Sequence, residues 1–149
     1  IFPAACPDSL IVEDLKTTLQ SASPLMGSWQ KRVLPCYELV TGSSRPEISQ
    51  FAHPVFKPDG QSGNLLLQGY TLPALTTLFN DAAKPSPGKP ITLNETGIDY
   101  PVDLVIPARA LNDPDLLQQS LIKYHLKLIP TIRPLSVFVL TENPSYNNH

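Results

Sequence analysis

The chain has 149 residues, of which 42% are hydrophobic and 16% are charged, and its formal net charge is -2. This length suits a single domain over residues 1–149 with a buried core, and the weak, scattered charge argues against the concentrated basic face that nucleic-acid binding needs. No apolar run reaches the roughly 18 residues that a membrane-spanning helix requires, so we predict no transmembrane segment in this chain.

The first predicted element is a helix over residues 9–21, where Asp8 or Ser9 can serve as the N-cap. Its apolar residues recur at helical spacing. The chain then favours strands over residues 29–34 and 36–41. Because Pro35 lies between them, the pair is either one kinked strand or two strands joined by a tight turn.

Residues 42–63 are predicted to be a long loop, since Gly, Ser and Pro dominate and no periodicity remains. A loop of this length in a compact domain is either functional or mobile. Phe51, Val55 and Phe56 are apolar residues within it that can still pack onto the core.

The rest of the chain alternates between predicted strands and helices. Helices are expected over residues 72–83 and 114–125, with Pro73 and Pro114 in their first turns, where a missing N–H costs nothing. Asp113 is the expected cap of the second of these helices. Thr96-Gly97 is expected to form a turn. Strands are expected over residues 64–70, 91–93, 102–106, 126–132 and 135–142, the last two separated by Pro134.

These elements predict an α+β fold, with a mixed or antiparallel sheet covered by about three helices and built from β-α-β-β type units. The residues predicted to be buried are Leu15, Leu19, Leu75, Phe79, Leu104, Leu117, Leu121, Leu128 and Val139. The segments that begin at Asp14 and Asp115 both read as helix, strand, proline and strand. They are either an internal pseudo-repeat or two units that share only this general pattern.

Three motifs carry a resemblance to a known family. They are Leu34–Val40 (LPCYELV), the stretch Pro90–Ile106 with Thr96, Gly97, Ile98 and Asp103, and the triplet Leu126-Lys127-Leu128 followed by a closing strand. On these residues the chain resembles the C-terminal part of a domain of unknown function from the soil-associated protein family, found in acidobacteria and Bacteroidetes. The chain departs from the family pattern where Tyr100 and His125 replace glycines and Val102 replaces a tyrosine.

The resemblance implies that these residues are part of a longer protein and that the protein is exported, to the periplasm, to the cell surface or as a secreted protein. In an oxidising compartment Cys6 and Cys36 could form a disulfide, and the alternative is two unpaired thiols. The family's function is unknown, so the resemblance names no reaction.

No motif in the sequence predicts catalytic, cofactor-binding or metal-binding residues. His53, His125 and His149 lack metal-ligand spacing, and no Gly-x-Ser-x-Gly motif occurs. Asp99 and Asp103 point the same way on an extended strand, but they lie roughly 13 Å apart, too far to share a proton. We interpret Asp99 as a turn-stabilising residue and Asp103 as a solvent-facing one.

The sequence therefore favours a non-catalytic binding or protein-interaction module, with an unknown protein or peptide as its partner and no cofactor. The candidate interaction surface comprises Phe51, His53 and Phe56 in the loop, together with the turn Glu95–Tyr100, which contributes Tyr100. One alternative is a hydrolase with a site assembled around loop 43–63, in which His53 is the base and a nearby serine is the nucleophile. A third reading is a structural domain attached to an enzyme.

Overall fold

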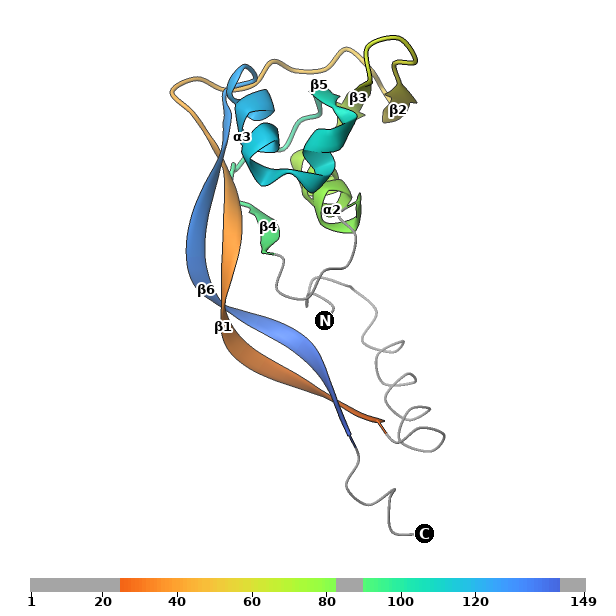
Figure 1. Ribbon diagram of the computed structural model, residues 1–149. Coiled ribbons are helices and arrows are strands. Elements are labelled where there is room, and N and C mark those ends of the chain that lie inside the picture. Colours follow the sequence, from red (N-terminus) through yellow and green to blue (C-terminus); the bar gives the residue numbers. More distant parts are fainter. Residues whose placement is uncertain (1–24, 83–89, 143–149) are drawn as a thin grey trace. The chain divides into compact units, whose positions relative to one another are not determined.

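The computed structural model describes residues 25–82 and 90–142 (Figure 1). The chain divides into two compact units. Unit 1 comprises residues 1–34 and 132–149, and unit 2 comprises residues 35–131. Two strands of 17 residues each, β1 (Leu25–Thr41) and β6 (Leu126–Glu142), contribute to both units. The organisation of the chain as one domain stays a prediction.

The described residues form an α+β structure with two sheets of three strands, as the predicted fold class requires. The sheets have the strand orders β4-β1-β6 and β2-β3-β5, where a single sheet was predicted. These residues contain two α-helices and one 3-10 helix, fewer than the predicted three α-helices, and the predicted helix 9–21 lies outside them. The remaining elements are β2 (Val55–Pro58), β3 (Asn64–Tyr70), α2 (Leu72–Ala82), β4 (Ile91–Asn94), β5 (Val102–Pro107), η1 (Ala108–Asn112) and α3 (Pro114–Ile122).

The sheet β4-β1-β6 is mixed. β4 pairs in parallel with Cys36–Leu39 of β1. β6 is antiparallel to β1, because the N–H of Gly42, directly after β1, donates to the carbonyl of His125, directly before β6, at 2.6 Å. The predicted mixed sheet is therefore present, although it contains only three strands.

Prolines lie inside both long strands, where the sequence predicted interruptions. In an antiparallel pair, successive residues turn their N–H groups alternately toward and away from the partner strand. Counted from the hydrogen-bonded pair Gly42 and His125, Pro35 and Pro130 turn their nitrogens away from the partner strand, and Pro134 has the same orientation as Pro130. No hydrogen bond between β1 and β6 is therefore lost at these positions. Both predicted strand pairs are therefore single strands, and the tight turn at Pro35 is wrong.

The sheet β2-β3-β5 is antiparallel throughout, with β3 in the middle. Leu65 and Leu67 of β3 and Leu104 and Ile106 of β5 are paired across the strands and buried, so one face of this sheet lines the core. The register shifts between Leu67 and Tyr70. This irregularity places a bulge beside the loop that precedes β2.

Local signals at the starts of both α-helices are confirmed. The side chain of Asp113 accepts hydrogen bonds from the backbone N–H groups of Asp115 and Leu116, and Pro114 begins α3. At α2, the Thr71 hydroxyl accepts from the N–H of Ala74 at 3.4 Å. These side chains satisfy donors that have no partner within the first helical turn.

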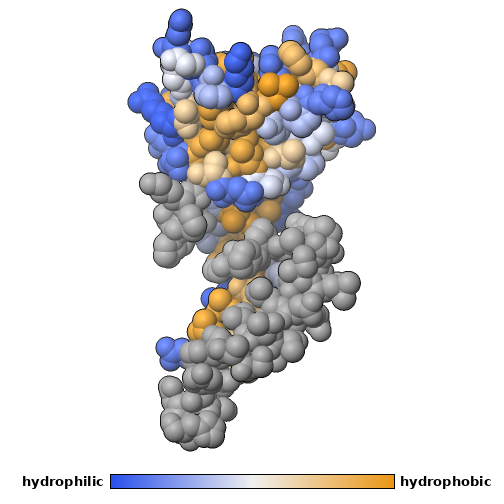
Figure 2. All heavy atoms as spheres, turned by 90° about the vertical axis from the view of Figure 1, so that its right-hand side faces the viewer, coloured by the Kyte–Doolittle hydropathy of each residue, from blue (hydrophilic) through white to orange (hydrophobic). Residues whose placement is uncertain are grey.

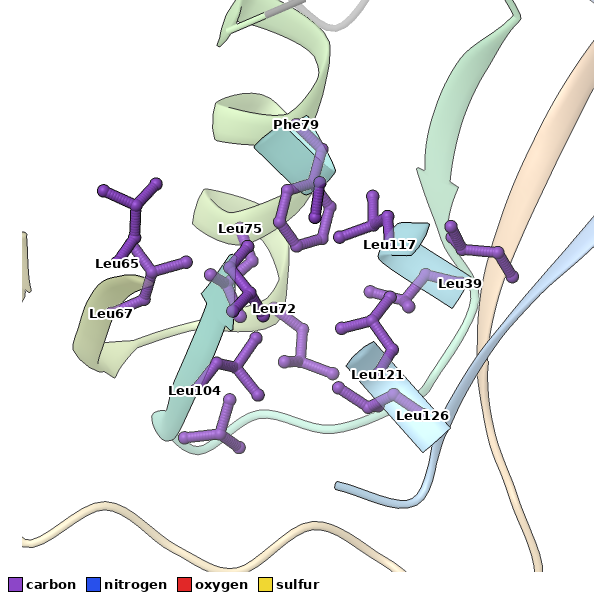
Figure 3. Close-up of a cluster of buried hydrophobic side chains, with 14 of the residues drawn as sticks. Leu39, Leu65, Leu67, Leu72, Leu75, Phe79, Leu104, Leu117, Leu121 and Leu126 are labelled. Carbon is purple, nitrogen blue, oxygen red and sulfur yellow. The ribbon is translucent and has the colours of Figure 1, made fainter. Parts of the chain in front are cut away.

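The hydrophobic core lies in unit 2 and joins the two helices to both sheets (Figure 3). Leu72, Leu75 and Phe79 of α2 and Leu117 and Leu121 of α3 bury their side chains in it. Of the residues predicted to be buried, the following are confirmed: Leu75, Phe79, Leu104, Leu117, Leu121 and Leu128. Val139 is only half-buried, because the buried side chains of this strand segment are its neighbours Val137 and Phe138. Leu15 and Leu19 lie outside the described residues.

In unit 1, the described parts of β1 and β6 are joined by an aromatic contact. The rings of Trp29 and Phe138 lie edge to face, with their centroids 5.4 Å apart. A Cβ atom at Gly27 would lie 2.1 Å from the Phe138 ring, so that ring covers the glycine. β1 and β6 have equal lengths, but the helix preceding β1 in the proposed repeat lies outside the described residues, so the repeat stays a prediction.

The end of α3 carries a residue in a left-handed backbone conformation. His125 has φ 61°, and no other non-glycine residue in the described part of the chain has a positive φ. The N–H groups of Tyr124 and His125 donate to carbonyls three residues earlier, so the chain tightens after Ile122 and the helix ends three residues before the predicted position.

We expect His125→Gly to raise the free energy of unfolding by about 0.5–1 kcal/mol, because glycine adopts the left-handed region without steric cost. His125→Val should lower it, since a β-branched side chain is strained there. Chemical denaturation of both variants and the wild type measures the difference. Equal stability of the glycine and valine variants would contradict this explanation.

Candidate interaction surface

The segment between β1 and β2, residues 42–54, is held against unit 2 at several points. The Ser49 N–H donates to the Pro101 carbonyl at 2.8 Å, and the Ser49 hydroxyl accepts from the Phe51 N–H at 3.0 Å. Pro46 and Ser49 are buried. The loop therefore has a defined path over the core even though its sequence shows no periodicity.

Tyr100 is one of the anchors of this loop. Its hydroxyl donates to the carbonyl of Pro46 at 2.9 Å, and the residue is half-buried. It packs against the core cluster of unit 2. Tyr100, predicted as part of the interaction surface, is thus placed to position the loop, and its hydroxyl is engaged within the chain.

Four apolar side chains in and after the loop are exposed to solvent, and we call them the loop surface. They are Ile48, Phe51, Val55 and Phe56, with exposed fractions of 60%, 41%, 37% and 48%. Figure 2 shows apolar side chains among hydrophilic ones on the side of the molecule where Figure 1 shows β2 and β3. Exposed aromatic and aliphatic side chains on a fixed backbone can contact an apolar partner with little loss of loop entropy.

Gly69 in β3 determines how closely the loop approaches the sheet. A Cβ atom at this position would lie 2.7 Å from the carbonyl oxygen of His53 and 3.2 Å from the Cβ of Phe51. Gly69 has φ 69°, and its N–H donates to Oδ1 of Asp103 at 2.8 Å. The prediction that Asp103 faces solvent is therefore wrong: this half-buried carboxylate supports the bulge beside the loop.

β2 occupies part of the segment that was predicted to be loop. Val55 is paired with Gln68 and Phe56 with Leu67, so these two consecutive side chains of β2 point to opposite faces of the sheet. The flanking prolines suggested a loop. An edge strand nevertheless accepts proline at positions whose backbone nitrogen faces away from the partner strand. Sequence reasoning placed Phe51 and Phe56 on the surface and missed Ile48 and Val55 as exposed residues. Ile48 and Val55 had the same sequence signal as Phe51 and Phe56, namely an apolar side chain in an otherwise polar segment.

The turn after β2 is organised by Asp59. Its carboxylate accepts hydrogen bonds from the Ser62 hydroxyl and from the Gln61 N–H. The bond from the Ser62 side chain, followed by that from the Gln61 backbone, lowers the pKa of Asp59 below its ordinary value. These contacts close the hairpin between β2 and β3 and account for the polar run that follows the loop surface.

The hydrolase alternative requires His53 as the base, and the structure places this residue in an exposed position. Among residues 25–82 and 90–142, its imidazole makes no hydrogen bond to a serine or a carboxylate. The serine nearest to it in the preceding loop, Ser49, uses its hydroxyl oxygen to accept from a backbone N–H.

The second predicted surface, the turn Glu95–Tyr100, contains few free apolar groups. Ile98 is buried, and Asn94 Oδ1 accepts from the Thr96 N–H and hydroxyl, as in a tight turn. Gly97 has φ 65°, which confirms the predicted turn at this position. Asp99 is exposed. The turn mainly supports the loop through Tyr100.

Of the two cysteines, only Cys36 belongs to the described residues. It lies in β1 with 1% of its surface exposed, and Cys6 lies outside them. The disulfide stays a prediction. In the part of the chain that the structure describes, no group of three or more His, Cys, Asp or Glu residues could hold a metal ion. No helix among these residues has both the length and the apolar character needed to cross a membrane.

Comparison with known proteins identified no relative for this chain. No protein-family model matches the sequence, and neither a curated protein nor a solved structure matches it.

Proposed function

We propose that this chain is a non-catalytic protein-interaction module that binds a protein or peptide through the loop surface. The observation that carries the proposal is the combination of four exposed apolar side chains with a backbone held by Ser49, Tyr100 and Gly69. Interface centres are enriched in aromatic side chains, and rigid surfaces bind with a smaller entropic cost.

The proposed location is outside the cytoplasm, in the periplasm, at the cell surface or in the medium. It is supported by the resemblance to the exported soil-associated family through Leu34–Val40 and Pro90–Ile106. We also propose that the chain belongs to that family and is part of a longer protein. The alternative, a structural domain beside an enzyme, is a proposal as well. The imidazole of His53 is exposed and makes no hydrogen bond within residues 25–82 and 90–142, which gives no support to the hydrolase alternative.

The test uses a displayed library of random peptides and the purified chain as bait. We expect the wild type to enrich peptides that bind with a measurable Kd, and the double variant Phe51→Ser/Phe56→Ser to bind them at least tenfold more weakly. A tenfold change corresponds to about 1.4 kcal/mol, within the range for losing an aromatic contact at the centre of an interface. Isothermal titration calorimetry on each enriched peptide measures the change.

Ile122→Ser is the matched control, because Ile122 is also an exposed apolar residue of unit 2 but lies on α3. Its binding should equal that of the wild type. If the control and the double variant lose affinity equally, or if no peptide is enriched by the wild type, the loop surface is not the binding site. The hydrolase alternative gains support only if His53→Ala abolishes a hydrolytic activity of the wild type while the variant stays folded.

A further inference from the structure

We propose that the sheet edges of unit 2 are closed to an additional strand, so that neither a partner nor a second copy of this chain can bind there by strand addition. An open edge presents unpaired N–H and C=O groups and invites such pairing. The evidence for this proposal is the placement of prolines and of three polar side chains along the four outer strand segments of unit 2. It does not depend on the proposed function.

The outer edge of β2 is the edge most exposed to solvent, since all four residues of this strand are exposed. The N–H of Asp59 donates to the carbonyl of Asn64 at 2.8 Å, which makes this a hydrogen-bonded pair. Opposed residues alternate between hydrogen-bonded and non-hydrogen-bonded pairs, so Pro58 and Phe56 turn their backbone groups outward. Proline supplies a carbonyl but no N–H at its position.

Pro54, which directly precedes β2, continues the same alternation. Along Pro54, Phe56 and Pro58 the outer edge therefore offers one N–H donor, that of Phe56, where a strand of ordinary residues would offer three. An added strand would form only one of the three hydrogen bonds that this edge could otherwise donate. Prolines at outward positions are a known means by which edge strands resist pairing.

The opposite edge of the same sheet, formed by β5, is occupied from within the chain. The Tyr124 hydroxyl accepts a hydrogen bond from the Val105 N–H at 2.7 Å and donates to the Val105 carbonyl at 3.2 Å. The N–H of Ala108 donates to the Gly63 carbonyl, so Pro107 faces outward and again supplies no donor. One aromatic side chain and one proline thus close this edge.

The sheet β4-β1-β6 is closed at its unit 2 edges by two side-chain amides from the helices. Asn80 of α2 accepts from the Thr92 N–H at 2.7 Å and donates to the Thr92 carbonyl at 3.0 Å, as a neighbouring strand would. Gln118 of α3 accepts from the Leu128 N–H at 2.5 Å. In β6 the next outward position is Pro130, which has no N–H.

Closed sheet edges limit the ways in which unit 2 can bind a partner. Recognition by strand addition relies on a row of main-chain hydrogen bonds, which these edges do not offer. A partner of unit 2 must therefore contact side chains, and copies of the chain are protected from edge-to-edge association through unit 2. Pro54 and Pro58 offer the most direct test of edge closure. Among the described contacts, no helix side chain is hydrogen-bonded to the outer edge of β2, so this edge depends on the prolines.

The test replaces the two prolines in the double variant Pro54→Val/Pro58→Val, which restores two outward donors and adds a strand-favouring side chain. We expect this variant of the 149-residue chain to form dimers or larger species with a concentration-dependent mass in size-exclusion chromatography with light scattering. Infrared spectra should show added intermolecular β-structure. The wild type should remain monomeric over the same concentrations.

The matched control is Val55→Ile/Lys57→Val, which changes the two residues whose N–H groups face β3. It makes the strand more apolar without adding an outward donor, and it should stay monomeric. The proposal is overturned if the proline variant is as monomeric as the wild type, if the control associates equally, or if the wild type itself associates with added β-structure. Should the valine pair unfold the chain, Pro58→Ala restores one donor with a minimal side chain and is judged by the same outcomes.

Discussion

Replacing Leu121 with alanine is expected to lower the free energy of unfolding by about 3 kcal/mol, within the roughly 2–5 kcal/mol found for such core truncations. Leu121 lies on α3 with none of its surface exposed and belongs to the core cluster that joins both helices to both sheets. Its removal leaves a cavity that the surrounding side chains fill only in part. Urea denaturation followed by circular dichroism measures the loss.

The neighbouring residue provides the control for this prediction. Ile122 is on the same helix, but 52% of its surface is exposed. Ile122→Ala loses little buried area and gains helix propensity, so it should change the unfolding free energy by less than about 1 kcal/mol. Similar losses in the two variants would mean that α3 does not pack through Leu121.

Gly69→Ala is expected to cost about 2–4 kcal/mol, the second large effect. The left-handed backbone at φ 69° accounts for about 1–2 kcal/mol of this cost. The rest arises because the new Cβ would lie 2.7 Å from the carbonyl oxygen of His53, a backbone atom that cannot rotate away. The loop before β2 must then move off the sheet, so the variant should also weaken any peptide bound to the loop surface.

Gly63→Ala separates the two contributions. Gly63 has the same φ of 69°, but nothing lies within 4 Å of a Cβ placed there. This variant should cost only about 1–2 kcal/mol and leave the loop in place. The difference between the two glycines, measured by denaturation and by chemical-shift changes at residues 51–53, reports the close approach of the loop. Equal costs and unshifted loop signals would show that the loop does not rest on Gly69.

The mode of interaction follows from combining the loop surface with the closed edges. Phe51 and Phe56 offer apolar side chains, while the prolines on either side of Phe56 withhold main-chain donors. A partner bound here should therefore depend on side-chain shape and apolar area more than on an extended backbone. The two proposals remain separate, because the peptide screen tests the side chains and the proline variants test the edge.

Local sequence determined the α-helices and much of the core in unit 2. Helical spacing of Leu117 and Leu121, with Asp113 and Pro114 before them, was enough to predict α3 and its buried face. The turn at Gly97 followed from residue type alone. Such features depend on neighbours within a few positions, and the same physical preferences act in any chain. For the candidate site, apolar residues in a polar segment were sufficient to select Phe51 and Phe56.

Only the tertiary structure decided which side of each backbone faces a partner strand. Pro35 and Pro134 look like interruptions in sequence, yet they lie within continuous strands because their nitrogens turn away from the ladder. The same reason admits β2 beside Pro58. The left-handed conformation of His125 and the hydrogen bond from Tyr100 to Pro46, 54 positions away in sequence, depend on contacts between distant segments. Periodicity records which residues are apolar, whereas the direction of an N–H group depends on the strand that pairs with it.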